Sequence, residues 1–160
     1  MPIPPHVANF WDAFTRATSG VAESRFYEVF AFGDSQQLAD SLAELVLSGV
    51  KRATAASAWS FEAEGKRFPR PGDLSIVTSS AGTPLCVIET LMVDLVPFNE
   101  VTAEFAATEG EGDGSLAFWR QAHTHYFTRE CARIGRRFTQ DMPVACERFR
   151  VVFQLANGAV

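Results

Sequence analysis

The sequence has 160 residues, 47% of them hydrophobic and 21% charged, and its formal net charge is -5. This length predicts a single domain over residues 1–160, and the composition excludes disordered, collagen-like and disulfide-scaffold proteins. No apolar run approaches the ~18 residues that a membrane helix needs, so no membrane partner is expected, and the negative charge argues against DNA or broad non-specific nucleic-acid binding.

The first part of the chain is expected to alternate helices with short strands. Three aromatic residues at helical spacing predict a helix over residues 8–18, within a helical N-terminal extension over residues 1–28. Alternating side chains predict a strand over residues 26–32. Asp34 is expected to begin the next helix as part of a capping box, and Gly49 to end it. Its buried face is indicated by apolar residues at helical spacing: Leu38, Leu42, Leu45 and Val46.

The rest of the chain mixes loops, strands and helices without a repeat. The expected elements are a loop over residues 61–72, a strand at 74–77, a long strand over 84–96, a helix over 99–108, a helix from Ser115 and a strand over 144–153. Several short strands among helices indicate an α+β protein. We expect a small curled sheet or barrel with helices packed outside it.

Lysine is rare in this chain, and one of the two lysines has a notable neighbour. Lys51 and Thr54 are three residues apart, so their side chains meet only if the backbone turns after Gly49. A neutral lysine could take the hydroxyl proton of Thr54 and make it a nucleophile. An exposed lysine beside a strand threonine is the other interpretation, because the K-x-x-T pattern is common by chance.

A loop of alternating glycines and acids occupies residues 109–114. The glycines would let the backbone bring the carboxylate of Glu109 or Glu111 into a cleft, where it could act as an acid or a base. Asp113 is expected to cap the helix that follows. The alternative is a solvated turn with capping acids.

Other side chains are weaker candidates for a functional site. Glu89 lies on the apolar side of its strand by parity, which indicates either a carboxylate facing a cleft or an ion pair with an arginine. Trp59 could stack on a base. His123 is expected in the core and His125 at the surface, since residues two apart on a helix diverge and do not share a metal easily. No metal site is therefore expected.

The distribution of charge and the three cysteines lead to two further expectations. Residues 51–70 hold five basic and two acidic side chains, so a local basic patch with Lys66, Arg67 and Arg70 could exist on an acidic protein; solvated helix faces explain the same pattern. The three cysteines form no CxxC motif, and the N-terminus lacks the features of a secretory signal. A reduced, cytoplasmic setting is expected.

Six short motifs occur in order: Gly49–Thr54 (GVKRAT), Pro71–Leu74 (PGDL), Cys86–Thr90 (CVIET), Glu109–Trp119 (EGEGDGSLAFW), Asp141–Val144 (DMPV) and Cys146–Phe149 (CERF). In this combination the chain resembles the ASCH domain family, over about residues 30–153. The resemblance implies a PUA-like curled β-barrel with peripheral helices and a cleft. It also implies a nucleoside or RNA as the partner.

One compact branch of that family, similar to N4-acetylcytidine amidohydrolases, uses a lysine, a threonine and a glutamate. The resemblance assigns these roles to Lys51, Thr54 and Glu111, with Glu109 as the second choice for the glutamate, and it implies no cofactor. The chain departs from that branch in its N-terminal extension and its longer acidic loop. Arg52 stands where family members often have threonine, which adds a charge near the cleft.

Three functions follow as hypotheses. The first is hydrolysis of an acylated cytidine, which the net negative charge favours because the substrate is small. The second is a ribonuclease for single-stranded RNA, with Lys51 and Arg52 against phosphate and a groove past Lys66, Arg67 and Arg70. The third is a non-catalytic RNA-binding module that uses the same cleft and Trp59, with Glu89 and Glu109 as further binding residues.

Overall fold

The computed structural model describes residues 2–155 and places one five-stranded sheet among five helices. The α-helices are α1 (Ala8–Ala17), α2 (Gln36–Leu47), α3 (Ala58–Glu64), α4 (Ala103–Glu109) and α5 (Leu116–Arg133). The strands are β1 (Phe26–Phe30), β2 (Ala53–Ser57), β3 (Leu74–Thr78), β4 (Pro84–Pro97) and β5 (Pro143–Gln154). The mixed α+β class expected from the sequence is confirmed.

The strand order in the sheet is β1-β3-β4-β5-β2. β1 runs parallel to β3, and the other neighbouring pairs are antiparallel. The two long strands β4 and β5 form the centre, and the two five-residue strands β1 and β2 form the edges. Within residues 2–155 these edges do not pair with each other, so the sheet is open and the expected barrel is not confirmed.

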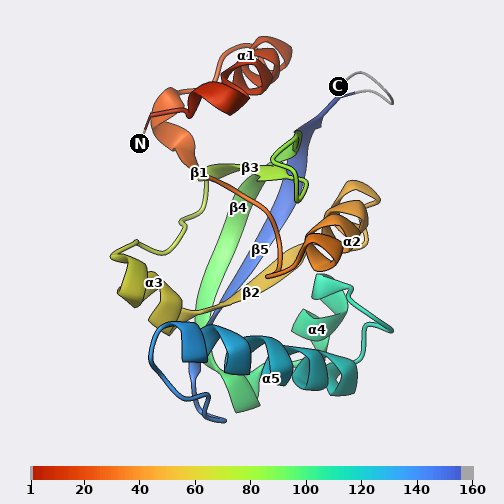
Figure 1. Ribbon diagram of the computed structural model, residues 1–160. Coiled ribbons are helices and arrows are strands. Elements are labelled where there is room, and N and C mark those ends of the chain that lie inside the picture. Colours follow the sequence, from red (N-terminus) through yellow and green to blue (C-terminus); the bar gives the residue numbers. More distant parts are fainter. Residues whose placement is uncertain (1, 156–160) are drawn as a thin grey trace.

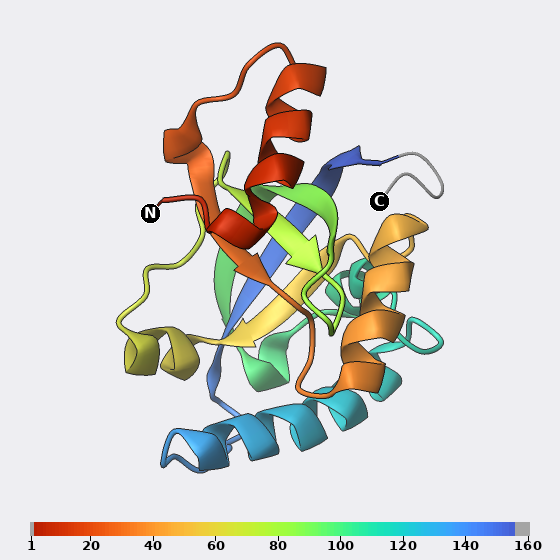
Figure 2. The same cartoon turned by 45° about the horizontal axis from the view of Figure 1, so that its top comes forward.

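The two ends of the sheet are covered by different helices. Figures 1 and 2 show α1 at one end and α5 across the other, with α2 beside the sheet. The aromatic residues Phe10, Trp11 and Phe14 of α1 are buried against Phe26 and Leu74, as their helical spacing predicts. Burying three such rings contributes several kcal/mol, at ~1.5–3 kcal/mol for each large apolar side chain.

Helices α2 and α5 enclose the region between them. α2 packs Leu42, Ala43 and Val46 against sheet residues that include Phe149, which confirms the predicted buried face. α5 contributes Trp119 to a separate cluster under the 3₁₀-helix Phe98–Glu100. No helix within the described range is both long and apolar enough to cross a membrane.

Local capping differs from the sequence predictions in detail. The N-cap of α2 is Ser35, not Asp34, and its hydroxyl accepts the Leu38 N–H at 3.1 Å. Ser115 caps α5 in the same way through Phe118, whereas Asp113 accepts the backbone N–H of Ser115. A serine one or two residues nearer the first helical turn reaches the free N–H groups better than the aspartate does.

The predicted boundaries of two further helices were wrong. Residues 61–64, predicted as loop, belong to α3, which Ser57 caps and which ends at Gly65 with φ 64°. The helix predicted over 99–108 is a 3₁₀ turn followed by α4, because Thr102 caps a new helix by accepting the Phe105 N–H. α4 then ends at Glu109, which is the first residue of the acidic loop.

Candidate active site

Lys51 is almost completely buried, with 1% of its surface exposed. α2 ends at Leu47, and Gly49 follows it with a φ of 82°, in the left-handed region that glycine adopts without strain. The N–H groups of Val50 and Lys51 then both donate to the carbonyl of Leu45, at 2.9 and 3.0 Å. A turn therefore follows Gly49 and directs Lys51 inward, although within residues 2–155 no hydrogen bond joins Lys51 to Thr54.

The acidic loop packs directly on this turn. Gly110 has a φ of 69°, and a Cβ atom there would lie 2.4 Å from the carbonyl oxygen of Val50. The backbone N–H of Arg52 donates to the carbonyl of Thr108 at 2.9 Å. Only glycine permits so close an approach, and this approach brings the flanking glutamates, Glu109 and Glu111, to Lys51.

The ammonium group of Lys51 has a partner for each of its three hydrogens. Nζ donates to the Ala53 carbonyl at 2.7 Å, to Glu109 Oε2 at 2.6 Å and to Glu111 Oε2 at 2.9 Å. Burial by itself would lower the pKa of Lys51, but the two carboxylates outweigh it and raise that pKa. Lys51 is therefore a charged ammonium in this structure, not the neutral base that the sequence hypothesis assumed.

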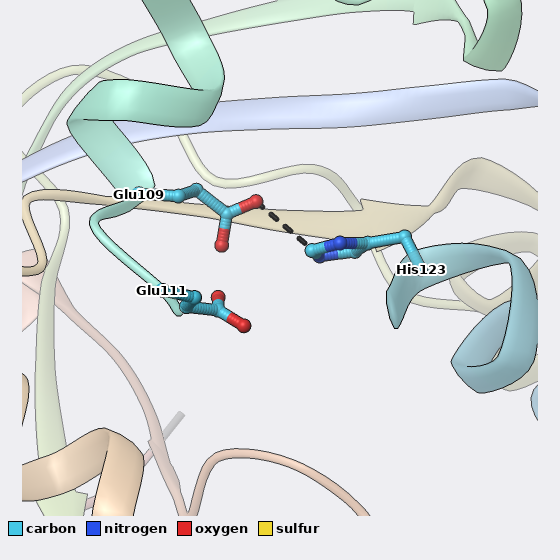
Figure 3. A group of neighbouring side chains, drawn as sticks. All are labelled: Glu109, Glu111 and His123. Carbon is cyan, nitrogen blue, oxygen red and sulfur yellow. Dashed lines mark ion pairs between the residues drawn. The ribbon is translucent and has the colours of Figure 1, made fainter. Parts of the chain in front are cut away.

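Glu109 is the anion that holds this site together. Its side chain is 1% exposed, and its Oε1 accepts the indole N–H of Trp119 at 2.7 Å. His123 Nε2 lies 3.4 Å from the same oxygen (Figure 3). Burial would raise the pKa of Glu109, but Lys51 and His123 outweigh this effect and hold it well below its usual range. Glu109 therefore stays ionised.

His123 is a functional candidate that sequence reasoning placed only in the core. Its Nδ1 lies 2.9 Å from the Trp119 carbonyl, which accepts only, so Nδ1 carries a hydrogen. The Nε2 lone pair of a neutral ring would then face the Glu109 carboxylate. The ionised glutamate outweighs burial and raises the pKa of His123, which favours the imidazolium. The spacing of Trp119 and His123, four residues apart on α5, was the available signal.

Glu111 differs from Glu109 although both touch Lys51. Burial, together with its neighbour Glu109, raises the pKa of Glu111 to about 7. A carboxyl group with that pKa exchanges a proton readily at neutral pH, which suits it to acid–base chemistry. The acidic loop therefore supplies one permanent anion and one proton-exchanging group, both bound to the same ammonium.

The same side chains offer a potential cation site. One ligand atom from each of Glu109, Glu111 and His123 lies within 4.8 Å of the others. Lys51 donates to the Oε2 atoms of both glutamates, so these two carboxyl groups already share a cationic partner. The positive charge here is supplied by the lysine itself.

These groups line a cavity of about 750 Å³ that also contains Thr54. This volume falls within the range of small-molecule sites. Among residues 2–155 the Thr54 hydroxyl has no hydrogen-bond partner, Lys51 included, so it is free to meet a ligand. Of the residues singled out from the sequence, the cavity brings together Lys51, Thr54, Lys66, Glu109 and Glu111.

Glu147 is a further cavity residue for which the sequence carried no clear signal. It lies on β5 directly across from Thr54 on β2. Its Oε2 accepts the hydroxyl hydrogen of Thr90 at 2.6 Å. Burial raises the pKa of Glu147 to about 7. Its sequence context, CERF, gives no hint of this environment, because only strand pairing places it beside Thr54.

The remaining predicted binding residues lie outside the cavity lining. Arg52 is exposed, and Arg70 is exposed and donates its backbone N–H to Asp73. Arg67 is bound to the same carboxylate through NH1 at 2.7 Å. Trp59 is half-buried, and Arg136 lies 4.6 Å above its ring.

Glu89 is also outside the cavity lining, and its environment matches one of the two sequence interpretations. Its carboxylate pairs with Arg25 at 2.9 Å and with Arg150 at 2.7 Å, which is the arginine ion pair considered for it. The register of β4 against β3 is regular from Cys86 to Glu89, so Val87 and Glu89 lie on the same face of β4, as parity predicted.

Comparisons with known proteins agree with this architecture. The ASCH domain model matches residues 28–153. The crystal structure of an ASCH domain from Lactobacillus crispatus JV V101 is similar at 32% identity and a TM-score of 0.86, covering 96% of this chain and 98% of that one. The crystal structure of a protein from Enterococcus faecalis V583 is similar at 32% identity and a TM-score of 0.83, and the match covers 91% of this chain and 87% of that one. The comparison with curated proteins gave no match. The chain belongs to the ASCH domain family.

Proposed function

We propose that this protein is an amidohydrolase that removes the acyl group from an acylated cytidine-type nucleoside. The observation that carries the proposal is the buried Lys51 ammonium, bound to Glu109 and Glu111 in a cavity that also contains the Thr54 hydroxyl, which has no hydrogen-bond partner within residues 2–155. A nucleophile, a proton carrier and a fixed charge are the parts that an acyl transfer needs.

Thr54 acts as the nucleophile in the proposed reaction. Lys51 first passes a proton to Glu111 Oε2, 2.9 Å away, and the lone pair that this frees then accepts the Thr54 proton as Thr54 Oγ forms a bond to the acyl carbon. Lys51 is thereby an ammonium again, the form that its raised pKa favours. Glu111, with a pKa near 7, is the group that changes protonation state.

The acyl–nitrogen bond then breaks. The leaving N4 amine takes the proton back through Lys51, and the acyl group remains as an ester of Thr54. Water attacks this ester with the same proton relay, which releases the carboxylic acid and restores the Thr54 hydroxyl. Glu109 stays ionised and positions Lys51, while His123 balances its charge.

Two features favour a small substrate over a long RNA. The cavity is about 750 Å³, enough for a nucleoside. Of the three basic residues expected to line an RNA groove, only Lys66 lines this cavity, and Arg67 is bound to Asp73. These features support the nucleoside hypothesis over the ribonuclease and the RNA-binding module.

The test is incubation of the protein with N4-acetylcytidine, following loss of the acyl chromophore. Wild-type turnover is expected, with a loss of at least about 100-fold in Thr54→Ala and in Glu111→Gln. Thr83→Ala, at an exposed turn, and Glu100→Gln, at an exposed 3₁₀ turn, are matched controls and should retain turnover. Absence of turnover in the wild type, or full turnover in Thr54→Ala, would refute the proposal.

A further inference from the structure

The cavity contains a half-buried carboxyl group, that of Glu147, which the proposed reaction does not use. Glu147 on β5 and Thr54 on β2 are directly opposite in the antiparallel register, and both line the cavity. Side chains of such a pair project from the same face of the sheet, with Cβ atoms about 4.5–5.5 Å apart. Glu147 therefore lies next to the hydroxyl that is proposed to attack the substrate.

One oxygen of Glu147 is bound and the other is open. Oε2 accepts the Thr90 hydroxyl hydrogen at 2.6 Å, and Oε1 has no hydrogen-bond partner within residues 2–155. Every fully buried side-chain oxygen and nitrogen in that range has a partner, so Oε1 must be accessible. Since Glu147 lines the cavity, we infer that Oε1 is exposed toward the cavity.

This environment is unlike that of the buried carboxyl groups. Glu109 is bound by Lys51 and Trp119, and Asp73 is bound by Arg67 and by the N–H of Arg70. Within residues 2–155 the hydrogen-bond partner of Glu147 is a neutral hydroxyl; Lys66 lowers its pKa without a hydrogen bond, and Glu28 and Asp73 raise it. A partly desolvated carboxylate without a bound cation is costly, and the protonated form avoids that cost.

The protonated form has a defined arrangement of donor and acceptor. Burial raises the pKa of Glu147 to about 7, against the lowering effect of the Thr90 hydrogen bond, so the neutral acid is well populated at neutral pH. Because Thr90 donates to Oε2, the proton belongs on Oε1. The group then offers an O–H donor beside a carbonyl acceptor.

We propose that Glu147 recognises the N3 and N4 edge of a cytosine ring, with Oε1–H donating to N3 and Oε2 accepting from N4–H. The inference rests on the proposed function for its substrate class, but it concerns recognition of the base and not the hydrolysis. Uracil presents the reverse pattern, an N3–H donor and an O4 acceptor, and is not matched in this orientation.

Aromatic side chains in the same cavity suit this ligand. Phe30, Phe32, Phe61 and Tyr126 are among its lining residues. Such rings provide surfaces on which a base can stack, while the carboxyl group reads its edge. Stacking alone tolerates any base, so selectivity for cytosine depends on Glu147.

The first test needs only the wild-type protein. Cytidine, uridine and 3-deazacytidine, which has C–H in place of N3, are titrated into it by calorimetry at neutral pH. Cytidine is expected to bind at least about tenfold more tightly than either analogue, because each analogue leaves a buried polar group unpaired. Equal affinities for cytidine and 3-deazacytidine, or no binding of cytidine at millimolar concentration, would overturn the inference.

The second test uses three variants. Glu147→Leu should weaken cytidine binding at least about tenfold, whereas Glu147→Gln keeps a donor and an acceptor and should restore most of it. Glu44→Gln, at an exposed position of α2 outside the cavity lining, is the control. If Glu147→Leu fails to fold, the comparison of cytidine with its two analogues on the wild-type protein still tests the inference. Binding of cytidine without turnover of N4-acetylcytidine would refute only the proposed hydrolysis. Turnover without a preference for cytidine would refute only the proposed role of Glu147 in recognition.

Discussion

Glu109 and Glu147 line the same cavity, the first fully buried and the second half-buried, and their partners differ. Glu109 contacts a lysine, an indole N–H and a histidine, and its pKa is held well below the usual range. Glu147 contacts one threonine hydroxyl, and burial raises its pKa to about 7. Burial alone therefore does not decide the charge of a carboxyl group here. The cation supplied by Lys51 does.

This difference separates two roles. A carboxylate that remains ionised can position an ammonium group, which is what Glu109 does for Lys51. A carboxyl group that carries a proton at neutral pH can donate a hydrogen bond, which an ionised one cannot. Substitutions can disturb the environment of Glu109 and that of Glu147 separately, because the hydrogen bonds of Lys51 and the Thr90–Glu147 pair share no side chain.

The largest effect is expected from Lys51→Met. This change leaves two buried carboxyl groups without their cation, which typically costs about 3–5 kcal/mol. Urea denaturation at neutral pH measures the free energy of unfolding. Lys66→Met is the control, because the Lys66–Glu28 pair is about a third exposed and its loss should cost ~1 kcal/mol or less. Equal losses in the two variants would show that Lys51 does not hold the acidic loop.

Gly110→Ala should disturb the same side of the comparison through the backbone. An alanine there adds left-handed strain of about 1–3 kcal/mol and a contact of 2.4 Å with the Val50 carbonyl. Gly114→Ala is a matched control, since Gly114 also has a positive φ, 79°, but no atom within 4 Å of the added Cβ. Gly110→Ala should lower both stability and turnover more than Gly114→Ala does. If the two are equally destabilising, the close approach of the loop is unimportant.

Glu147→Gln tests the environment of Glu147 through the pH dependence of the free energy of unfolding. Because burial raises the Glu147 pKa from 4.5 to about 7, the folded state binds this proton more tightly than the unfolded state does. The resulting stability is present below pH 4.5 and is lost as pH rises through 7. Glutamine does not titrate, so the variant should gain roughly 1–3 kcal/mol over the wild type between acidic and mildly alkaline pH.

The measurement is denaturation of both proteins across that pH range. Glu28, Asp73 and Lys66 act on the Glu147 carboxyl in both proteins, so the difference between the two isolates position 147. Glu44→Gln, at an exposed position of α2, controls for the loss of one carboxyl group. A difference that stays constant with pH would mean that Glu147 is ionised in the folded protein.

Thr90→Val should have the smallest effect. It removes the donor to Glu147 Oε2, at a cost of ~1 kcal/mol in stability. The Thr90 hydrogen bond lowers the Glu147 pKa, so its removal should raise that pKa further. NMR titration of the Glu147 carboxyl carbon measures the shift, with the exposed Thr83→Val as the control. A lower pKa in Thr90→Val would contradict the assigned hydrogen bond.

The sequence by itself determined much of the framework. Helical spacing located α1 and α2 with their buried faces, and the motifs around Lys51, Thr54 and the acidic loop indicated the ASCH family before any contact was known. These signals are local, because periodicity, caps and glycine turns depend on residues a few positions apart. The same locality explains the errors at α3, α4 and the helix caps, where competing nearby residues decided the boundary.

Only the tertiary structure decided which side chains share the site. Lys51 and Glu109 are 58 residues apart, and their contact depends on Gly110 packing against Val50. Thr54 meets Glu147 through the register of β2 and β5. Parity places Glu89 on its face of β4, but only the fold brings Arg25 and Arg150 to its carboxylate. Burial, register and charge pairing are properties of the packed chain, and they shift the pKa values of Glu109, Glu111 and Glu147 in this cavity.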